Sequence, residues 1–177
     1  MEGITTCPRK SATGSSSLSV NSTGADNTAV GHGALSANTT ASENTSVGRA
    51  SLQQNTTGTA NAALGFKALN ANTTGSSNTS VGKDSLKVNT TASNNVAVGF
   101  ESLCKNTTGT CNVAVGKGAL KANLTTSENT AVGTNALNGN TGDYNTGLGA
   151  SSLENNTGDN NTAVGRRALY LKTSGAN

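Results

Sequence analysis

The sequence has very few of the large apolar residues from which globular proteins build their cores. Aromatic residues are limited to Phe66, Phe100, Tyr144 and Tyr170, tryptophan is absent, and apolar residues make up only 32% of the chain. Such a composition would by itself favour disorder, because too little apolar surface is available to offset the chain entropy that folding costs. An ordinary globular core is excluded, so an ordered fold must gather its few aliphatic side chains into one narrow column.

Side chains suited to catalysis are also scarce. His32 is the only histidine, and the acidic residues are isolated, so the sequence offers no carboxylate pair for acid–base chemistry and no metal-ligand spacing. His32 belongs to a tandem repeat, at a position that other copies fill with Arg49, Phe66 or Lys117, which is typical of a solvated loop residue. We therefore expect no enzymatic activity, no metal and no cofactor.

Long charged and apolar runs are absent as well. The formal net charge is +3, and the lysine and arginine residues are scattered without aromatic residues between them, so nucleic acid is not an expected partner. No segment is long and apolar enough to cross a membrane, and residues 1–4 do not begin an apolar signal segment. We expect no membrane insertion. The expected location is extracellular or on a virion surface, reached by virus assembly and lysis or after removal of a signal.

The dominant feature that the sequence does contain is the tandem repeat N-T-A-V-G-x-x-A-L-x-x-N-T-T-G-x-x, whose residues we number as positions 1 to 17. Full copies begin at Asn27, Asn44, Asn61, Asn78, Asn95, Asn112 and Asn129 and, after a shortening to 16 residues, at Asn145 and Asn161. A fixed period of this size indicates one supersecondary unit that is copied and stacked. Residues 1–9 form a lead-in segment, residues 10–26 a degenerate capping copy, and residues 27–177 the nine full repeats.

The pattern within a copy predicts β-structure. β-branched residues, glycine and asparagine fill every copy, and no apolar stripe of helical period survives, so helix is disfavoured. Position 5 is always glycine, which suits a corner, and the N-T-T-G segment suits a second turn. We predict an all-β parallel β-solenoid with two short strands per coil, at positions 1–5 and 7–11, and a rod about 45 Å long at about 4.8 Å of rise per coil.

Two positions of the repeat supply nearly all of the large aliphatic residues. Position 4 is always valine or leucine, and position 9 is always leucine. We expect both to point inward, with position 2 on the same strand face as position 4, and to stack as a core ladder. Its members are Val30, Val47, Leu64, Val81, Val98, Val115, Val132, Leu148, Val164, Leu35, Leu52, Leu69, Leu86, Leu103, Leu120, Leu137, Leu153 and Leu169.

Positions 3 and 8 contain only alanine, serine or glycine, whereas positions 6, 7, 10 and 11 carry lysine, arginine and acidic residues. We interpret the small residues as a surface that presses closely against identical chains around an axis. The alternative is tight packing of the two sides of one flattened coil.

Asparagine fills position 1 of every full copy and position 12 of all but the last. One interpretation is a pair of side-chain amide ladders along the stack, as in other cross-β arrays. The other is N-glycosylation, because many of these residues begin an N-x-S/T sequence. The residues concerned at position 12 are Asn38, Asn55, Asn72, Asn89, Asn106 and Asn123. The ladder is favoured, because Asn140 and Asn156 keep the asparagine where the shortened turn loses that sequence.

Two of the three cysteines, Cys104 and Cys111, occupy positions 10 and 17 of one copy and flank a single turn. A disulfide could pin that turn. The odd number of cysteines, with Cys7 left over, favours reduced thiols instead.

The N-V-A-V-G sequence at residues 95–99 and 112–116, with its relatives N-T-A-V-G and N-T-S-V-G, resembles the repeat in the YadA-like head of trimeric autotransporter adhesins. The longer N-T-A-V-G-x-x-A-L form is similar to repeats of phage and viral tail-fibre proteins. The resemblance covers about residues 27–177. It implies a left-handed parallel β-roll of which three chains pack side by side around a three-fold axis.

These observations together predict a non-catalytic structural or adhesive fibre segment. Its expected partner is itself, as a homotrimer, and its varied outer positions would meet a cell-surface glycan or receptor weakly at many sites. The alternative is a self-polymerising extracellular filament built from rods joined end to end. A third possibility, ice binding, is suggested by the threonine columns at positions 2, 13 and 14, although substitutions interrupt them.

Overall fold

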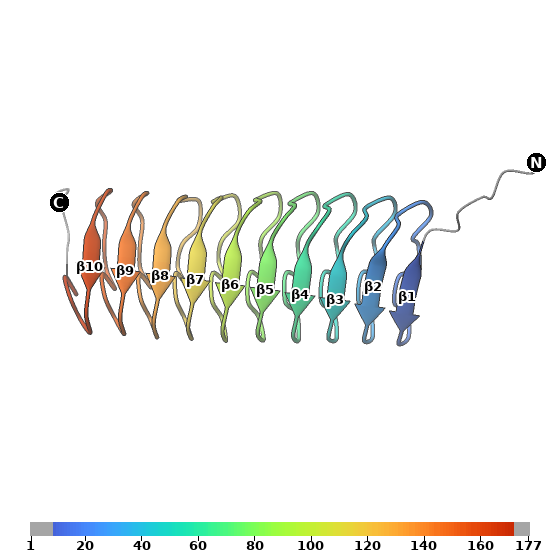
Figure 1. Ribbon diagram of the computed structural model, residues 1–177, viewed down its shortest axis with the longest axis horizontal. Helices are drawn as coiled ribbons and strands as arrows, with labels where there is room; N and C mark the ends of the chain where they lie inside the picture. The colour runs from blue at the N-terminus through green and yellow to red at the C-terminus, as the bar shows by residue number, and fades with distance from the viewer. Residues whose placement is uncertain (1–8, 172–177) are drawn as a thin grey trace, which may run out of the picture.

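Each copy of the repeat forms one coil of a rod, and each coil contributes one short strand. The structure is a computed structural model, which describes residues 9–171 (Figure 1). The strands are β1 (Lys10–Thr13), β2 (Asn27–Val30), β3 (Thr45–Val47), β4 (Ala62–Leu64), β5 (Thr79–Val81), β6 (Val96–Val98), β7 (Val113–Val115), β8 (Thr130–Val132), β9 (Thr146–Leu148) and β10 (Thr162–Val164). The predicted parallel β-solenoid is confirmed, and the described residues contain no helix.

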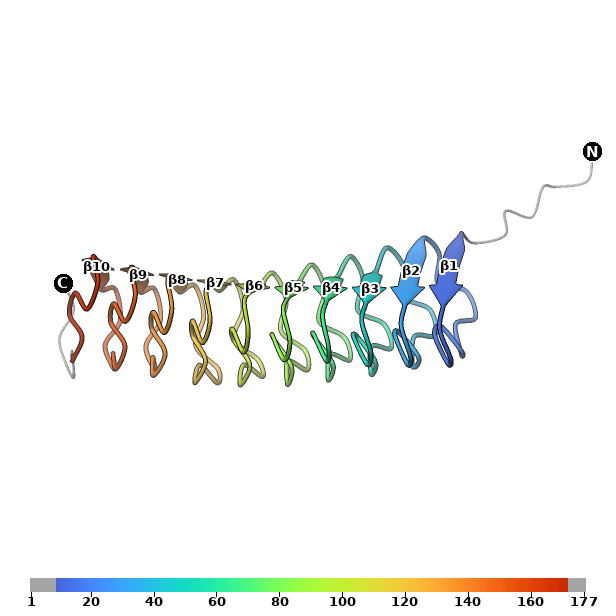
Figure 2. The same cartoon turned by 90° about the horizontal axis from the view of Figure 1, so that it is seen from below.

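All ten strands form a single parallel sheet in sequence order, so every strand pairs with the equivalent strand of the next coil. Figure 2 shows them along one side of the rod, with the returning segments on the other side. The register matches equal positions of the repeat, for example Ala29 with Ser46. It survives the shortening, where Thr130 pairs with Thr146, because the missing residue belongs to the turn and not to the strand. The degenerate copy also forms a coil, with Lys10 opposite Asn27.

The second predicted strand, at positions 7–11, is absent. Position 7 has φ between 55° and 69°, and the position 9 leucines have φ between 46° and 52°, so this segment alternates through the left-handed region and cannot form an extended strand. Its amides still bond along the stack. Ala50 N donates to His32 O of the preceding coil, and Leu52 N donates to Ala68 O of the following coil. A left-handed leucine costs about 1–2 kcal/mol, which the burial of its side chain, worth about 1.5–3 kcal/mol, offsets.

The core is one column of leucines facing small residues. The position 9 side chains from Leu35 to Leu153 are fully buried, whereas Leu169, in the last coil, is 46% exposed. They cluster with the buried alanines of positions 3 and 8. At Gly147, a position 3 residue, an added Cβ would lie 2.9 Å from Ser152 Oγ across its own coil and 3.2 Å from the Leu137 side chain of the preceding coil. The coil is therefore so flat that one leucine fills the space between its two sides.

The prediction that position 4 points inward is wrong. Val30 is 41% exposed, Leu64 50% and Val132 39%, and Val47, Val81, Val98 and Val115 are only partly buried, while Leu148 and Val164 are also exposed. Side chains alternate along a strand, so a buried position 3 places positions 2 and 4 outside. The interior, already occupied by leucine, has room for alanine or serine but not for valine.

The interpretation of positions 3 and 8 as an interchain surface is also wrong, and the alternative holds. These residues are buried within one coil. Serines there bond across the interior: Ser46 Oγ donates to Ser51 O of its own coil at 2.8 Å, and Ser51 Oγ donates to Ala63 O of the next coil at 3.2 Å. Small side chains are needed because the strand and the returning segment lie close together.

The glycine corner at position 5 depends on the coil next to it. Gly99 has φ 134°, and a Cβ added there would lie 2.6 Å from Gly116 O and 2.7 Å from Gly116 C. A side chain would therefore collide with backbone that has no freedom to move. In the last coil, Gly165 has φ 120° but nothing within 4 Å of the added Cβ.

Candidate functional site

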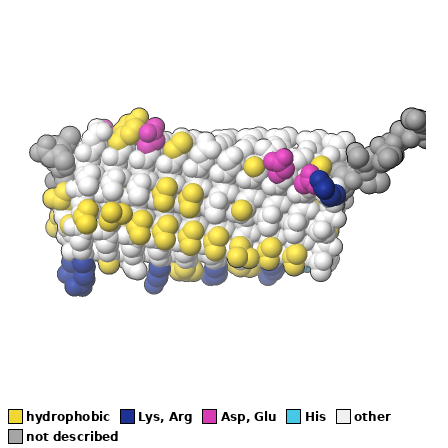
Figure 3. Space-filling model, in the orientation of Figure 1, with side chains coloured by type: hydrophobic (Ala, Val, Ile, Leu, Met, Phe, Trp, Pro, Cys, Tyr) yellow, Lys and Arg dark blue, Asp and Glu magenta, His cyan; other side chains and the backbone are white. Residues whose placement is uncertain are grey.

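The outer face of the sheet is the most extensive candidate for an interaction surface. We call it the strand face and define it as positions 2 and 4 of the nine full copies, from Thr28 to Val164. It contains threonine, valine, leucine and one alanine, Ala62, and no charged residue. Figure 3 shows apolar side chains in a row across the strands. With one strand for about every 4.8 Å of the rod, the strand face is a long and regular surface without charge.

The strand face is more apolar than a solvated sheet requires. Positions 6, 7, 10 and 11 carry most of the lysine and arginine, so the sequence does place charge on other exposed positions. An antiparallel or solvated sheet normally alternates apolar and polar faces, but here the buried positions carry alanine and serine and the outer positions valine. A row of exposed and partly buried aliphatic residues is typical of interaction surfaces, which makes the strand face a candidate site.

The corner and the returning segment present a varied polar surface. Arg49 lies over the ring of Phe66, with 5.8 Å from its Cζ to the ring centroid, and Lys83 Nζ lies 5.3 Å from the centroid of Phe100. Lys121 Nζ lies 2.7 Å from Glu101 Oε2, and this hydrogen bond raises the pKa of the Lys121 amine. These contacts differ from coil to coil, as the variable sequence of these positions predicts.

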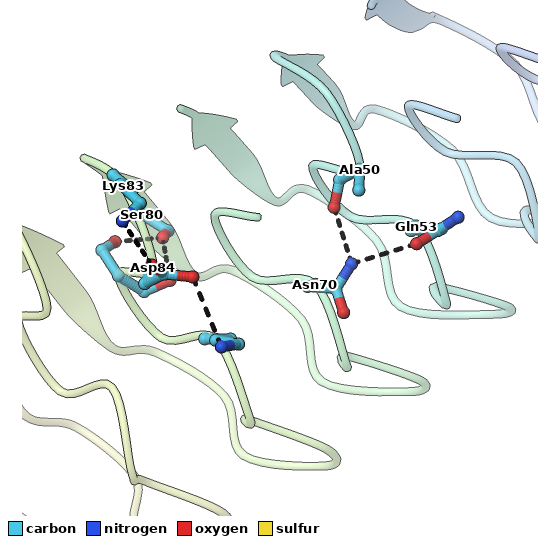
Figure 4. A network of polar contacts seen from close by, with 8 residues as sticks. Ala50, Gln53, Asn70, Ser80, Lys83 and Asp84 are labelled. Atoms are coloured by element: carbon cyan, nitrogen blue, oxygen red, sulfur yellow. Dashed lines mark hydrogen bonds and ion pairs between the residues drawn. The ribbon is translucent and has the colours of Figure 1, made fainter. Parts of the chain in front are cut away.

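Figure 4 shows how residues of neighbouring coils connect on this surface. Asn70 Nδ2 donates to Ala50 O at 2.8 Å and to Gln53 Oε1 at 3.2 Å, which links its coil to the preceding one. Asp84 lies between two lysine amines, its Oδ2 3.5 Å from Lys83 Nζ and its Oδ1 3.5 Å from Lys87 Nζ. The Asn70 contacts therefore join two coils, whereas the Asp84 ion pairs lie within one coil.

A hollow of about 280 Å³ lies on the same surface. Its lining includes Lys105, Lys117 and Lys121 together with Glu101 and Glu154. The lysine and glutamate charges largely balance, and no aromatic side chain lines it. It is a polar depression between coils and has no concentrated charge that would select a ligand.

The position 12 asparagines form a ladder in the structure. Asn72 Nδ2 donates to Asn55 Oδ1 at 2.8 Å and to Gly75 O at 2.8 Å, and Asn72 Oδ1 accepts from Asn89 Nδ2 at 2.9 Å. The same pattern joins Asn38, Asn55, Asn72, Asn89, Asn106 and Asn123. Each of these side chains is fully buried. Glycosylation of these six residues is therefore incompatible with the fold, because a glycan would remove an N–H that donates to the ladder and would need space that the turn fills.

The position 1 asparagines form a second ladder of a different kind. The side-chain oxygen of each accepts from the backbone N–H of the next, as in Asn44 N to Asn27 Oδ1 and Asn95 N to Asn78 Oδ1, both at 3.0 Å. The ladder continues through the shortened copies, where Asn145 N donates to Asn129 Oδ1 at 2.9 Å. The ladder thereby provides a hydrogen-bond acceptor for the backbone N–H of these asparagines, at the start of the strand region of each coil.

The position 12 ladder is interrupted where the period changes. Asn140 Nδ2 lies 3.5 Å from Thr126 Oγ1 and not against Asn123, and the Thr126 hydroxyl itself donates to Asn123 Oδ1. The row of backbone bonds between position 13 residues runs as far as Thr107 N to Leu124 O at 2.8 Å. A hollow of about 120 Å³ lies here, lined in part by Leu124, Thr126 and Asn140. We call residues 122–126 with 140 and 141 the period junction.

Cys104 and Cys111 are both free thiols, so the disulfide proposed from their spacing is not formed. Cys104 is half-buried on the returning segment, with its Sγ 3.8 Å from Lys121 O, and Cys111 is exposed beside the start of β7. Burial, assisted by the nearby Glu101 carboxylate, raises the pKa of the Cys104 thiol. Cys7 lies outside the described residues.

His32 is an exposed residue beside the glycine corner, as its variable position predicts. Among residues 9–171, no group of three or more histidine, cysteine or acidic side chains could hold a metal ion. Within the same range, no helix of the length and apolarity that a membrane span requires is found. Comparison with protein families, with curated proteins and with solved structures finds no match to this chain.

Proposed function

We propose that this chain is a non-catalytic structural segment of a fibre, in which copies of the rod associate side by side through their strand faces, most simply as trimers. The varied residues of positions 10 and 11, on the returning segment away from the strand face, then form the outer surface of the fibre. A cell-surface glycan or receptor would bind there, weakly at each coil and with a gain from repetition.

One observation carries this proposal: the strand face is free of charge over all nine full copies and its position 4 column is aliphatic throughout, while neighbouring exposed positions carry charge. Single exposed aliphatic residues need no explanation, but a continuous row of them does. Association would bury that row of aliphatic side chains. It would add apolar burial that the interior of the rod cannot provide, because each coil contributes only one leucine to the core. The resemblance to adhesin-head and tail-fibre repeats favours the same arrangement.

The test is the mass of the purified chain, measured by sedimentation equilibrium over a range of concentrations. We expect three chain masses. The double variant Val98→Lys with Val115→Lys places two charges at the centre of the strand face and should be monomeric, with an unchanged circular dichroism spectrum. The control is Gln54→Lys, which adds a lysine at an exposed position 11, where another copy already carries Lys105, and which should leave the mass unchanged.

A chain that is monomeric at every concentration would overturn side-by-side association. Filaments of uniform width in negative-stain micrographs would instead support the end-to-end filament, in which the end coils and not the strand face make the contact. A double variant that assembles like the unmodified chain would show that the strand face is not the interface.

A second candidate function, ice binding, gains from the outward direction of position 2. Six of its nine residues are threonine, next to the position 4 aliphatic residues on the same flat face. Ala62, Val96 and Val113 interrupt that column. This candidate requires the strand face to be open to water, so it applies only to a monomeric rod. Inhibition of ice recrystallisation by the unmodified chain, and its loss in Thr79→Lys, would support it.

A further inference from the structure

The two edges that border the strand face carry opposite charge. Positions 6 and 7, which come directly after each strand, form the strand-end edge, and positions 16 and 17, which precede each strand, form the strand-start edge. From residue 32 to residue 167 the strand-end edge contains Arg49, Lys67, Lys83, Lys117, Arg166 and Arg167 against two acidic residues, Asp84 and Glu101. From residue 25 to residue 160 the strand-start edge contains Asp26, Glu43, Glu128, Asp143 and Asp159 and no lysine or arginine.

Figure 3 shows this separation, with lysine and arginine along the lower edge of the rod and acidic side chains along the upper edge. Part of this charge is engaged within the chain: Lys83 pairs with Asp84 and Glu101 with Lys121. The carboxylates of Asp143 and Asp159 accept backbone N–H groups, whereas Arg49 forms no ion pair in the described part of the chain. Asp26 pairs with Arg9 at 2.8 Å, but in the described part of the chain Glu43, Glu128, Asp143 and Asp159 form no ion pair. Glu43 and Arg49 are both exposed. A small net charge of +3 thus conceals a rod with one basic and one acidic edge.

The direction of the strands decides which edges can meet when strand faces associate. In one arrangement the rods are parallel and are related by rotation about an axis that runs along the rods. The strands of all copies then point in the same rotational direction around that axis. The strand-end edge of one copy therefore meets the strand-start edge of the next. If two rods are antiparallel, related by a two-fold axis along the strands, each edge meets its own kind. The first arrangement brings opposite charges together, and the second brings like charges together.

We propose that copies of this chain pack parallel and without axial shift, with the strand-end edge of each copy against the strand-start edge of its neighbour. This inference rests on the proposed association through the strand face and adds its direction and register. Rotation about the rod axis keeps equal coils at equal height. Glu43 and Arg49 flank the same strand, β3, so Glu43 of one copy faces Arg49 of the neighbouring copy. Asp159 similarly faces Arg166 and Arg167 across β10.

The test is a charge swap at the exposed pair beside β3. Arg49→Glu and Glu43→Arg, each alone, place like charges opposite each other at every contact around the axis. Each should raise the chain concentration needed for half-assembly by about tenfold at low salt. The double variant Glu43→Arg with Arg49→Glu should return this concentration to within about threefold of the unmodified chain. In about 1 M salt, where charges are screened within about 3 Å, the differences should disappear.

The design separates the interchain pair from other effects. Glu43 and Arg49 lie at opposite ends of one strand, so their swap cannot restore a contact within a chain, and Glu43→Arg cannot replace the contact between Arg49 and Phe66. The control Lys105→Glu makes the same change of charge at position 11, away from both edges, and should leave assembly unchanged. Single variants that assemble like the unmodified chain would overturn the edge pairing. So would a double variant whose loss of assembly equals the sum of the losses in the two single variants. Trimers of the unmodified chain would still support the proposed function in that case, whereas a monomeric unmodified chain would overturn the proposed function itself.

Discussion

At the scale of single residues, the fold depends on two side-chain types that are rarely decisive elsewhere, glycine and asparagine. Glycine at position 5 matters because the backbone of the next coil occupies the place where a Cβ would be. Asparagine at positions 1 and 12 matters because its amide carries both a donor and an acceptor and can therefore repeat without limit along a stack. Both requirements involve the neighbouring coil, in addition to the contact that Asn72 Nδ2 makes with Gly75 O of its own coil and the positive φ of the glycine corner.

The glycine requirement predicts a difference between two equivalent positions. Gly99→Ala should lower the free energy of unfolding by more than about 3 kcal/mol, because a clash with Gly116 backbone adds to an unfavourable φ. In Gly165→Ala the added Cβ has no atom within 4 Å. Its free energy of unfolding should therefore fall by only about 1–3 kcal/mol, which is the cost of the unfavourable backbone conformation. Urea unfolding followed by circular dichroism measures both. Equal losses would show that the backbone conformation, and not the neighbouring coil, imposes glycine.

The asparagine ladder predicts a large effect from an isosteric change. Asn72→Asp removes the two hydrogen bonds that Asn72 Nδ2 donates and places a carboxylate against the oxygens of Asn55 and Gly75, so it should cost about 3 kcal/mol or more at neutral pH. The loss should shrink as the pH falls, because burial raises the pKa of the new carboxyl and its protonated form can donate again. Asn94→Asp, at an exposed position 17, is the control and should have little effect at either pH. Thermal unfolding at two pH values distinguishes these outcomes.

At the scale of the coil, the interior is a single leucine against small residues, and the second large aliphatic residue lies outside. The two columns look alike in the sequence, since each is nearly invariant in its residue type. They differ in backbone conformation: position 4 ends an extended strand and leads into the glycine corner, whereas position 9 has a left-handed backbone that turns its side chain into the coil.

This assignment predicts opposite results for two truncations in one coil. Leu103→Ala should lower the free energy of unfolding of the monomeric chain by about 2–5 kcal/mol, because Leu103 is fully buried and its removal leaves a cavity. Val98→Ala should cost less than about 1 kcal/mol in the monomer, because Val98 lies on the strand face. Denaturant titrations below the assembly concentration compare them. A larger loss for Val98→Ala would reverse the assignment of the core.

At the scale of the whole molecule, the rod is a one-dimensional array in which each coil contacts only its neighbours, so its stability is a sum of coil and interface terms. We expect the period junction to make the weakest internal contribution to that sum. There the position 12 ladder passes through the Thr126 hydroxyl, and a hollow of about 120 Å³ replaces packed atoms.

Hydrogen exchange should therefore be non-uniform along the rod. We expect the slowest exchange in the central strands β4 to β7, and a local maximum of the exchange rate among residues 124–126, faster than the equivalent turn at residues 73–75. Mass spectrometry of proteolytic fragments after timed exchange resolves the two turns, which serve as matched segments of one chain. Equal rates in both turns would show that the change of period does not weaken the stack.

The fold and the candidate site could be predicted from the sequence to different depths. The period by itself determines the stacking, the parallel register and the chemistry of the ladders, because a residue type that recurs every 17 residues must meet its own copy in the next coil. It also places charge around the coil, since positions 6, 7, 16 and 17 have fixed places relative to the strand. These are properties of repetition, and they need no knowledge of the cross-section.

Only the tertiary structure decided which side of each strand is inside. Alternation along a strand separates two faces but does not say which one is covered, and the larger side chains of position 4 suggested the wrong one. The deciding quantity is the thickness of the coil: the core consists of leucines such as Leu103 with small residues such as Ala97, so Val98 has no space there and lies on the outer face. The same thinness buries the asparagine ladder beyond the reach of a glycan and leaves the aliphatic side chains of position 4 on an outer face without charge.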